Sequence, residues 1–201
     1  MKALFFDIGG VLLTNAWDTG ERSEAAARFS FDSGEAEKRH VLHFEALERG
    51  EISLDDYLSR VYFFKKRNFT RRSFVRFMES CSKPFPENLK ILKKLAARKK
   101  YFMAALNNES AGMNAYRIRR YGLDSAFSAF FSSCYLGCRK PSPEIFEKTL
   151  AMTRFRPQEC LFIDDRPENV KAARRFGFRT VTVQRPGELA AGLAAAGIPA
   201  R

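Results

Sequence analysis

Five acidic or amide residues of this sequence stand in the same kind of position. Each one follows a short apolar run that has the composition of a buried strand. The five are Asp7, Asn107, Asn108, Asp164 and Asp165. The carboxyl ends of parallel strands share one edge of a sheet, where open α/β folds bind ligands, so we expect these side chains to meet there. Such a group of oxygen-bearing side chains predicts a site for a hard divalent cation with a phosphate.

A lysine is predicted to join this group. Lys140 lies just before Ser142, which begins a helix together with Pro143 and Glu144. The lysine ammonium group and the free backbone amides of that helix would point toward the same place. Three carboxylates, one lysine and two amides suit a cation that carries a phosphate, and hard oxygen ligands favour Mg²⁺.

Two glycines after Asp7 indicate a tight functional turn. Gly9 and Gly10 permit positive φ and a close approach of the backbone just past the strand. Each piece also has a plainer explanation. Asp7 could be a satisfied buried carboxylate, the later Asp pair could cap a helix, the two Asn could be turn residues, and the lysine could be solvated. These explanations do not predict the common placement, so we favour the site.

The elements that would position these residues alternate along the chain. Strands are predicted at residues 4–6, 101–106, 127–131, 160–163 and 179–183. Helices are predicted at 86–100, in a segment ending at 121, and at 142–152, 167–177 and 188–196. This alternation predicts an α/β fold with a Rossmann-like parallel sheet.

Residues 15–83 interrupt that alternation and carry helical periodicity without a strand signal. Helices are expected at 35–48, from Ser53 through Val61, and after Thr70, whereas residues 15 to 33 read as polar and irregular. We therefore predict an inserted all-helical cap at 15–83 and a Rossmann-like core formed by 1–14 and 84–201.

Composition is that of an ordinary globular protein with one sizeable core. The chain has 201 residues, of which 45% are hydrophobic, and no apolar run approaches the roughly 20 residues that cross a bilayer. Asp7 and its glycines break the first apolar run before it reaches signal-peptide length. The four cysteines form no CxxC pair, which favours reduced thiols. We expect a cytoplasmic protein without a membrane partner.

The net charge of +12 is concentrated outside the cap. Residues 15 to 85 hold 13 Lys and Arg against 12 Asp and Glu, so the positive field belongs mainly to the core and would attract anionic ligands. The cap segment 60–76 nevertheless mixes basic and aromatic residues without an acid. It could bind nucleic acid, but inward-packed rings with solvated charges are the favoured interpretation, so a nucleic-acid partner is not expected.

The sequence resembles the haloacid dehalogenase superfamily of hydrolases through four motifs that occur in family order. They are Phe6-Asp7-Ile8-Gly9-Gly10-Val11-Leu12, Leu106-Asn107-Asn108, Arg139-Lys140-Pro141-Ser142-Pro143 and Phe162-Ile163-Asp164-Asp165-Arg166-Pro167-Glu168-Asn169. A helical cap inserted between the first two motifs is what the resemblance implies for one major subclass.

The resemblance implies a phosphatase that works through an aspartyl-phosphate on Asp7. Mg²⁺ would be held by Asp7, the Gly9 carbonyl and Asp164, with Asp165 behind them or as an alternative ligand. Lys140 would neutralise growing negative charge, while the Asn107 side chain and the Asn108 backbone N–H would bind phosphoryl oxygens. The substrate would be a small phosphorylated metabolite.

The sequence departs from the family pattern in two places. Gly9 stands where phosphatases of this family usually carry a second Asp, the general acid for the leaving group, and Asn107 stands where Ser or Thr is usual. The loss of that acid predicts a substrate with a good leaving group, or an acid supplied by the cap. A non-catalytic binding protein is the alternative. Dehalogenation is disfavoured because it needs no metal, whereas the Asp164–Asp165 pair suits one.

Overall fold

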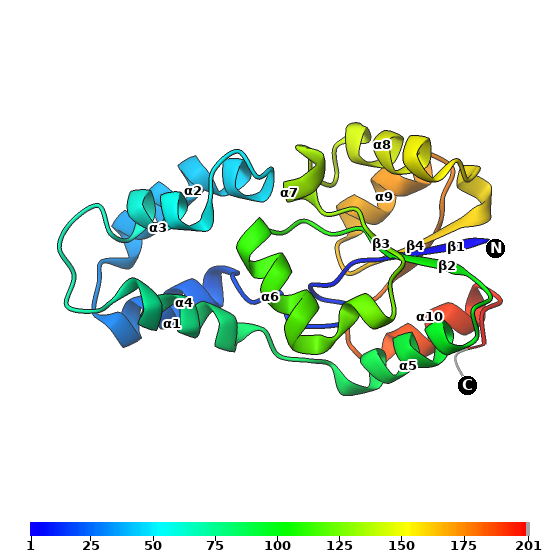
Figure 1. The fold of residues 1–201 in the computed structure, drawn as a ribbon, viewed down its shortest axis with the longest axis horizontal. Coiled ribbons are helices and arrows are strands. Elements are labelled where there is room, and N and C mark those ends of the chain that lie inside the picture. The colour runs from blue at the N-terminus through cyan, green and yellow to red at the C-terminus, as the bar shows by residue number, and fades with distance from the viewer. Residues whose placement is uncertain (200–201) are drawn as a thin grey trace.

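The computed structural model describes residues 1–199, and its centre is a five-stranded parallel sheet (Figure 1). The strand order is β3-β2-β1-β4-β5, so the first strand of the chain lies in the middle. The strands are β1 (Ala3–Phe6), β2 (Phe102–Ala105), β3 (Ala129–Phe130), β4 (Cys160–Asp164) and β5 (Arg179–Thr182). The sheet confirms the predicted α/β, Rossmann-like fold class.

Helices cover both faces of the sheet. They are α5 (Pro86–Ala97), α6 (Ala111–Tyr121), α7 (Ser133–Leu136), α8 (Pro143–Thr153), α9 (Pro167–Arg175) and α10 (Glu188–Ala195). Single-turn 3-10 helices occupy Leu123–Ser125 and Pro157–Glu159. Figure 1 shows α5 and α10 on one side of the strands and α8 and α9 on the other.

β1 is apolar at every position because both of its faces are covered. Leu4 and Phe6 pack into one apolar cluster with Leu92 of α5, whereas Phe5 packs into a second cluster with Ile145 of α8. All of these side chains are fully or almost fully buried. Alternate residues of the strand thus serve opposite layers, which fixes its register and the direction in which the residue after it emerges.

Four helices fill the segment between β1 and α5. They are α1 (Thr19–Phe29), α2 (Ser33–Glu48), α3 (Leu54–Val61) and α4 (Arg71–Cys81). Ser53 and Thr70 cap α3 and α4 as predicted, because each hydroxyl accepts a hydrogen bond from the backbone N–H three residues later. We call α1–α4 the cap. The exact division into a core of 1–14 and 84–201 and a cap of 15–83 stays a prediction.

The expectation that residues 15 to 33 are irregular is wrong over α1. This helix buries only Ala25 and Ala26, so its sequence has almost no apolar contrast to reveal its period. Tertiary contacts hold it instead. Phe29 packs 5.2 Å from Phe74 between ring centroids, and Arg22 forms a 2.7 Å ion pair with Glu37 of α2.

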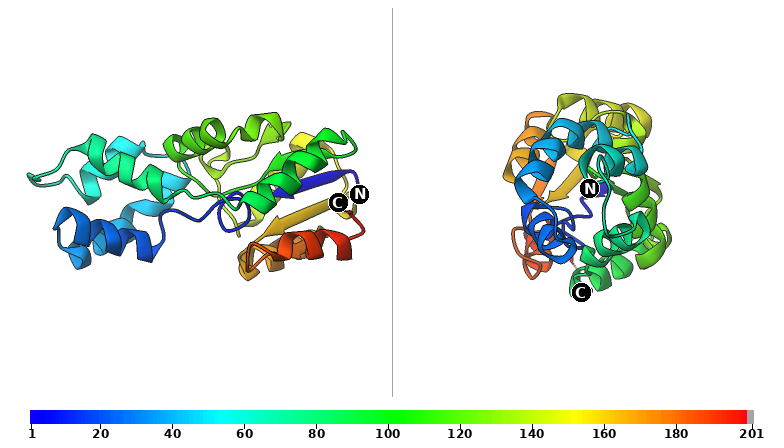
Figure 2. Two further views of the ribbon diagram at one scale, coloured as in Figure 1. Left: turned by 90° about the horizontal axis from the view of Figure 1, so that it is seen from below. Right: turned by 90° about the vertical axis from the view of Figure 1, so that its left-hand side faces the viewer.

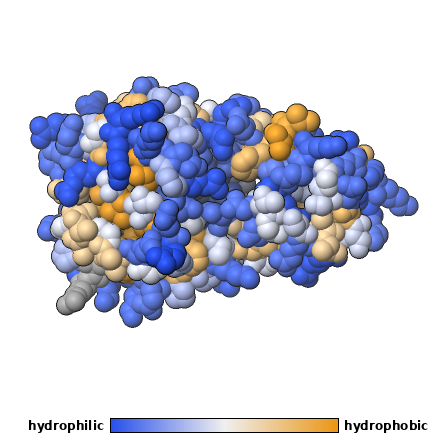
Figure 3. All heavy atoms as spheres, turned by 180° about the vertical axis from the view of Figure 1, so that it is seen from behind, coloured by the Kyte–Doolittle hydropathy of each residue, from blue (hydrophilic) through white to orange (hydrophobic). Residues whose placement is uncertain are grey.

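The cap lies at one end of an elongated molecule, beyond the carboxyl ends of the strands (Figures 1 and 2). The two connections between cap and core lie side by side: the Thr14 N–H donates to the Lys83 carbonyl at 2.8 Å, and the Lys83 N–H donates to Thr14 Oγ1 at 2.9 Å. Hydrophilic residues cover most of the face seen in Figure 3, with apolar residues in smaller patches. Among residues 1–199, no helix has both the length and the apolar character needed to span a membrane.

Candidate active site

Three carboxylates meet where β1 and β4 end. The strands pair in parallel with Phe6 opposite Ile163, so the residues that follow emerge together at the same edge. The backbone N–H of Asp7 extends the ladder by donating to the Ile163 carbonyl at 2.8 Å. One carboxylate oxygen from each of Asp7, Asp164 and Asp165 lies within 4.8 Å of the others. The predicted convergence of these three residues is therefore present.

Lys140 lies between two of these carboxylates. Its Nζ is 2.8 Å from Asp7 Oδ2 and 2.6 Å from Asp164 Oδ2, and the residue is 1% exposed. The peptide bond to Pro141 is cis. The Asn108 side chain holds the backbone of Lys140, because its Nδ2 donates to the Lys140 carbonyl and its Oδ1 accepts from the Lys140 N–H, both at 2.8 Å. Asn108 therefore positions the lysine.

The charges in this cluster do not balance. Burial raises the pKa of Asp7, and the neighbouring Asp164 and Asp165 raise it further against the lowering effect of Lys140. Burial by itself would favour the neutral amine of Lys140, but the charges of Asp164 and Asp7 outweigh it and raise the lysine pKa. The Lys140 ammonium and the Arg166 guanidinium oppose three close carboxylates, so a proton or a bound cation would relieve the excess negative charge.

Asp165 supplies direct support for a cation. Its Oδ1 is buried and has no hydrogen-bond partner among residues 1–199, while its Oδ2 accepts a 3.4 Å hydrogen bond from Asn15. A buried carboxylate oxygen without a partner is costly in a folded protein. The oxygen donors of the cluster are those that Mg²⁺ prefers, so the residues fit such an ion.

The two glycines after Asp7 have different surroundings. Gly10 has φ +68°, and a Cβ atom there would lie 2.1 Å from Asp165 Oδ2. The backbone at Gly10 therefore passes too close to the carboxylate to carry a side chain. At Gly9 a Cβ would lie 2.5 Å from Asn15 Oδ1. The Asn15 side chain thus occupies the space that a side chain would need at position 9, where phosphatases of the family that the sequence resembles usually carry Asp.

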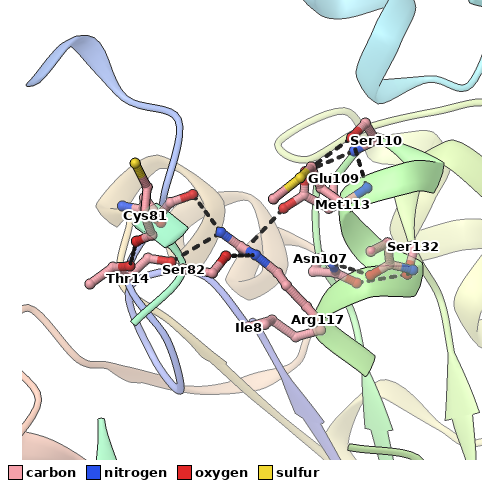
Figure 4. Close-up of polar contacts among 12 residues, drawn as sticks. Ile8, Thr14, Cys81, Ser82, Asn107, Glu109, Ser110, Met113, Arg117 and Ser132 are labelled. Atoms are coloured by element: carbon pink, nitrogen blue, oxygen red, sulfur yellow. Dashed lines mark hydrogen bonds and ion pairs between the residues drawn. The ribbon is translucent and has the colours of Figure 1, made fainter. Parts of the chain in front are cut away.

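The Asn107 side chain is hydrogen-bonded to two other buried side chains of the core. Its Nδ2 donates to Asn114 Oδ1 at 3.1 Å, and its Oδ1 accepts from Ser132 Oγ at 2.8 Å (Figure 4). The side chain is 1% exposed and does not line the cavity over Asp7. The Asn107 amide carries a second N–H besides the one donated to Asn114, and the predicted contact with a phosphate stays a prediction.

A partly open cavity lies over Asp7, between cap and core. About 70 Å³ of it is open to the centres of water-sized molecules. The cavity takes residues from both regions: Asp7, Gly9, Asn15, Trp17, Asp18, Phe44, Glu48, Asn108, Glu109, Arg117, Arg139, Lys140, Arg166 and Asn169. Trp17 contributes here while its ring packs 5.8 Å from Phe74 inside the cap.

Arg117 was not singled out from the sequence, yet it joins the two regions (Figure 4). Its guanidinium donates to the Thr14 carbonyl at 3.1 Å, to the Asn15 carbonyl at 2.7 Å and to Ser82 Oγ at 2.9 Å. It also forms a 3.0 Å ion pair with Glu109. An arginine on α6 carries no local sign of such contacts, because its partners on the two linkers lie far away in the chain.

Comparison with known proteins relates the whole arrangement to one family. A model of haloacid dehalogenase-like hydrolases matches residues 1–177. The chain is 30% identical over 162 residues to an Arabidopsis thaliana protein named flavin mononucleotide hydrolase 1, covering 81% of this chain and 65% of that protein, just under two thirds of its length. It is 24% identical over 191 residues to D-ribitol-5-phosphate phosphatase of Bacteroides thetaiotaomicron, with 90% of each chain covered.

A solved structure shares the fold. It is a haloacid dehalogenase family enzyme from Bacteroides thetaiotaomicron in complex with magnesium and inorganic phosphate. The TM-score is 0.78 at 24% sequence identity, covering 90% of this chain and 93% of that one.

Proposed function

The chain belongs to the haloacid dehalogenase-like hydrolases, and on that premise we propose that it is a Mg²⁺-dependent phosphatase acting on a small phosphorylated metabolite through an aspartyl-phosphate. The observation that carries this proposal is the cluster of Asp7, Asp164 and Asp165 near Lys140, in which Asp165 Oδ1 has no hydrogen-bond partner among residues 1–199. The relatives named for phosphate-ester hydrolysis support the same reaction class.

The nucleophile in this proposal is Asp7. One of its carboxylate oxygens attacks phosphorus in line, the bond from phosphorus to the leaving oxygen breaks, and water later hydrolyses the aspartyl-phosphate. Asp7, the Gly9 carbonyl and Asp164 would hold Mg²⁺, with Asp165 as a further ligand or behind them. When bound, the ion would offset the repulsion between the Asp7 carboxylate and the phosphoryl oxygens.

Two residues would stabilise the charge that develops on the phosphoryl group. Lys140 already places its ammonium 2.8 Å from the attacking carboxylate, so it meets growing negative charge without rearrangement. The backbone N–H of Asn108 would donate to a phosphoryl oxygen while its side chain keeps the lysine backbone in place. These contacts position the phosphoryl group and neutralise its negative charge, which is most of what phosphoryl transfer requires.

The arginines of the cavity favour an anionic substrate. Arg139 and Arg166 line the space over Asp7 together with Lys140. Positive groups that line a cavity raise the local concentration of phosphate esters. A small cavity suits a small metabolite unless the cap opens to admit a larger one.

Gly9 supports the one competing function, a binding protein that retains the fold but turns over poorly. A carboxylate is absent from the position that usually protonates the leaving group, and the Asn15 side chain fills the space above it. Such a protein would bind phosphate and Mg²⁺ with little hydrolysis, so only measured turnover separates the two functions.

The test is phosphate release by the purified protein with and without Mg²⁺. Substrates would be p-nitrophenyl phosphate and a panel of sugar, polyol and nucleotide phosphates. We expect Mg²⁺-dependent release that chelation abolishes and that Asp7→Asn lowers by at least about 10⁴-fold. Undiminished activity in a chelator, an active Asp7→Asn protein or failure of every substrate would refute the proposal.

A further inference from the structure

The proposed reaction needs a group that protonates the leaving oxygen, and Gly9 cannot supply one. Only four carboxylates line the cavity within residues 1–199: Asp7, Asp18, Glu48 and Glu109. Asp7 cannot protonate the leaving oxygen, because it forms the bond to phosphorus. The acid must therefore come from one of the other three, from water, or from the substrate itself.

Two of the three are already engaged or solvated. Glu109 Oε2 pairs with Arg117 at 3.0 Å, and its Oε1 accepts a 3.0 Å hydrogen bond from the Ser110 N–H. The Asp18 side chain is 52% exposed at the rim and pairs with Arg166 at 3.4 Å. Neither combines a free oxygen with the dry surroundings in which a carboxyl group keeps its proton.

Glu48 has both properties. It is the last residue of α2 and only 8% exposed, and its backbone carbonyl is fixed by a 2.6 Å hydrogen bond from Ser133 Oγ. Its Oε2 forms a 2.7 Å ion pair with Arg139 Nε, whereas its Oε1 accepts no hydrogen bond within residues 1–199. Glu48 is therefore a buried carboxyl group in the cavity wall with one oxygen engaged by Arg139 and the other available for a proton.

Three charged neighbours shift the pKa of Glu48 besides its burial. Arg139 and Arg166 lower its pKa, whereas Glu109 raises it, and Cys134 of α7 faces it as a neutral thiol whose own pKa burial raises to about 12. Burial is the largest influence and brings the Glu48 pKa to about 7. A group of that pKa exists in both protonation states near neutral pH, as a general acid that later acts as a base must.

We propose that Glu48, a residue of the cap, is the general acid and base that replaces the carboxylate missing at position 9. This role rests on the proposed phosphatase function. As Asp7 bonds to phosphorus and the leaving oxygen departs, the Glu48 carboxyl gives that oxygen its proton and becomes a carboxylate. In the second step Glu48 takes a proton from the attacking water, whose oxygen bonds to phosphorus, and phosphate and free Asp7 are released.

A purely mechanical role is the competing explanation, because Arg139 links the cap to the core. Glu45 of α2 already provides such a link, since its carboxylate lies 3.0 Å from Arg139 Nη1 and its side chain is 59% exposed. Fixing the cap through Arg139 therefore does not require a second carboxylate to be buried. Glu45→Gln is the matched control, since it removes an Arg139 partner from the same helix without touching the cavity.

The experiment compares kcat/KM for an aryl phosphate and an alkyl phosphate across a pH series. We expect the wild-type protein to hydrolyse both, and Glu48→Gln to lose about 10²–10⁴-fold on the alkyl ester while losing less than about 10-fold on p-nitrophenyl phosphate, whose leaving group needs no proton. A pH-rate limb near 7 should vanish in Glu48→Gln. A burst of nitrophenolate should appear in the same variant, because hydrolysis of the aspartyl-phosphate has lost its base.

The test stays valid if the variant is partly unfolded, because misfolding lowers both rates equally. The ratio of kcat/KM for the alkyl ester to kcat/KM for the aryl ester is then unchanged by it. Equal losses on both esters, or the same substrate selectivity in Glu45→Gln, would refute the role of Glu48 and leave the phosphatase intact. If the wild-type protein were already as selective for the aryl ester as Glu48→Gln, the role of Glu48 would likewise be refuted. Absence of any Asp7-dependent hydrolysis in the wild-type protein would instead overturn the proposed function and this role together.

Discussion

The core and the cap bury different kinds of polar chemistry. The sheet edge buries charged groups, with Asp7, Lys140 and Asp164 all at or below 8% exposure. The cap interior buries neutral ones, such as His40 and Tyr57, whose Nδ1 and hydroxyl lie 2.7 Å apart. Buried charge stabilises a fold poorly and is retained for chemistry, whereas satisfied neutral groups among rings stabilise it. Function and stability thus rest mainly on different regions.

The basic aromatic segment 60–76 illustrates how the cap is stabilised. Tyr62, Phe69 and Phe74 pack inward, with Tyr62 and Phe74 centroids 4.5 Å apart. Phe64 is half-buried beneath Arg39, whose guanidinium carbon lies 3.5 Å from the ring centroid. Rings engaged in this way are not free to stack on bases, so the contacts favour the packing interpretation over nucleic-acid binding.

The largest effect that would sharpen this comparison is expected from Lys140→Met. Removing the ammonium group leaves Asp7 and Asp164 without their buried partner and the phosphoryl group without its countercharge. We expect kcat to fall by about 10³-fold, the scale of losing one preorganised charge-stabilising donor. Steady-state phosphate release measures it.

Lys148→Met is the matched control for that substitution. Lys148 is a partly exposed lysine of α8, paired with Glu144 at 2.7 Å and remote from the cavity lining. It should keep its activity. If Lys140→Met retained more than about a tenth of wild-type kcat, the sheet edge would not need its buried cation for transition-state charge.

A smaller effect is expected from Arg117→Met. This substitution should lower the free energy of unfolding, because Arg117 connects the core to the linkers that lead into the cap. The substitution leaves Glu109 buried without its ion pair and removes hydrogen bonds to both linkers. Loss of one partner of a buried pair costs about 3–5 kcal/mol. Urea unfolding should show a loss on that scale.

A double variant tests whether the uncompensated charge causes that loss. In Arg117→Met/Glu109→Gln the residue at position 109 carries no charge to leave unpaired, so part of the stability should return. If the double variant were as unstable as the single one, the linker hydrogen bonds rather than the ion pair would hold the two regions together.

The sequence predicted most of the core because its signals are local. A short apolar strand followed by a polar turn marks Asp7 and Asp164 without any knowledge of their neighbours, and the parallel register then brings them together. Lys140 was recognisable by its place before a helix start. Asn107 shows the limit of this reasoning, since the strand end predicts its position but not that Asn114 and Ser132 bind its amide.

The cap was less predictable because its structure depends on long-range contacts. α1 has almost no apolar stripe and is held by rings and an arginine from elsewhere in the chain. Glu48 gave no signal at all, since an acidic residue at a helix end is ordinarily solvated. Only the approach of Arg139 and α7 from the core makes it a buried group at the site.

The smallest predicted effect concerns the neutral network inside the cap. Burial, with the nearby Arg22 charge, lowers the pKa of His40 to about 4. The unfolded chain binds a proton near pH 6.5 and the folded chain does not, so stability falls as the pH drops from about 6.5 to about 4. His40→Gln can still hydrogen-bond Tyr57 but cannot titrate, so the variant should lose this part of the pH dependence.

The measurement is the difference in unfolding free energy between wild type and His40→Gln across that pH range. The wild type should lose up to about 3 kcal/mol relative to the variant between pH 7 and pH 4, because each pKa unit corresponds to about 1.4 kcal/mol. His43→Gln controls for removing a histidine from the same helix. Parallel curves for wild type and His40→Gln would mean that His40 takes up its proton inside the folded cap, and that this interior tolerates charge as the sheet edge does.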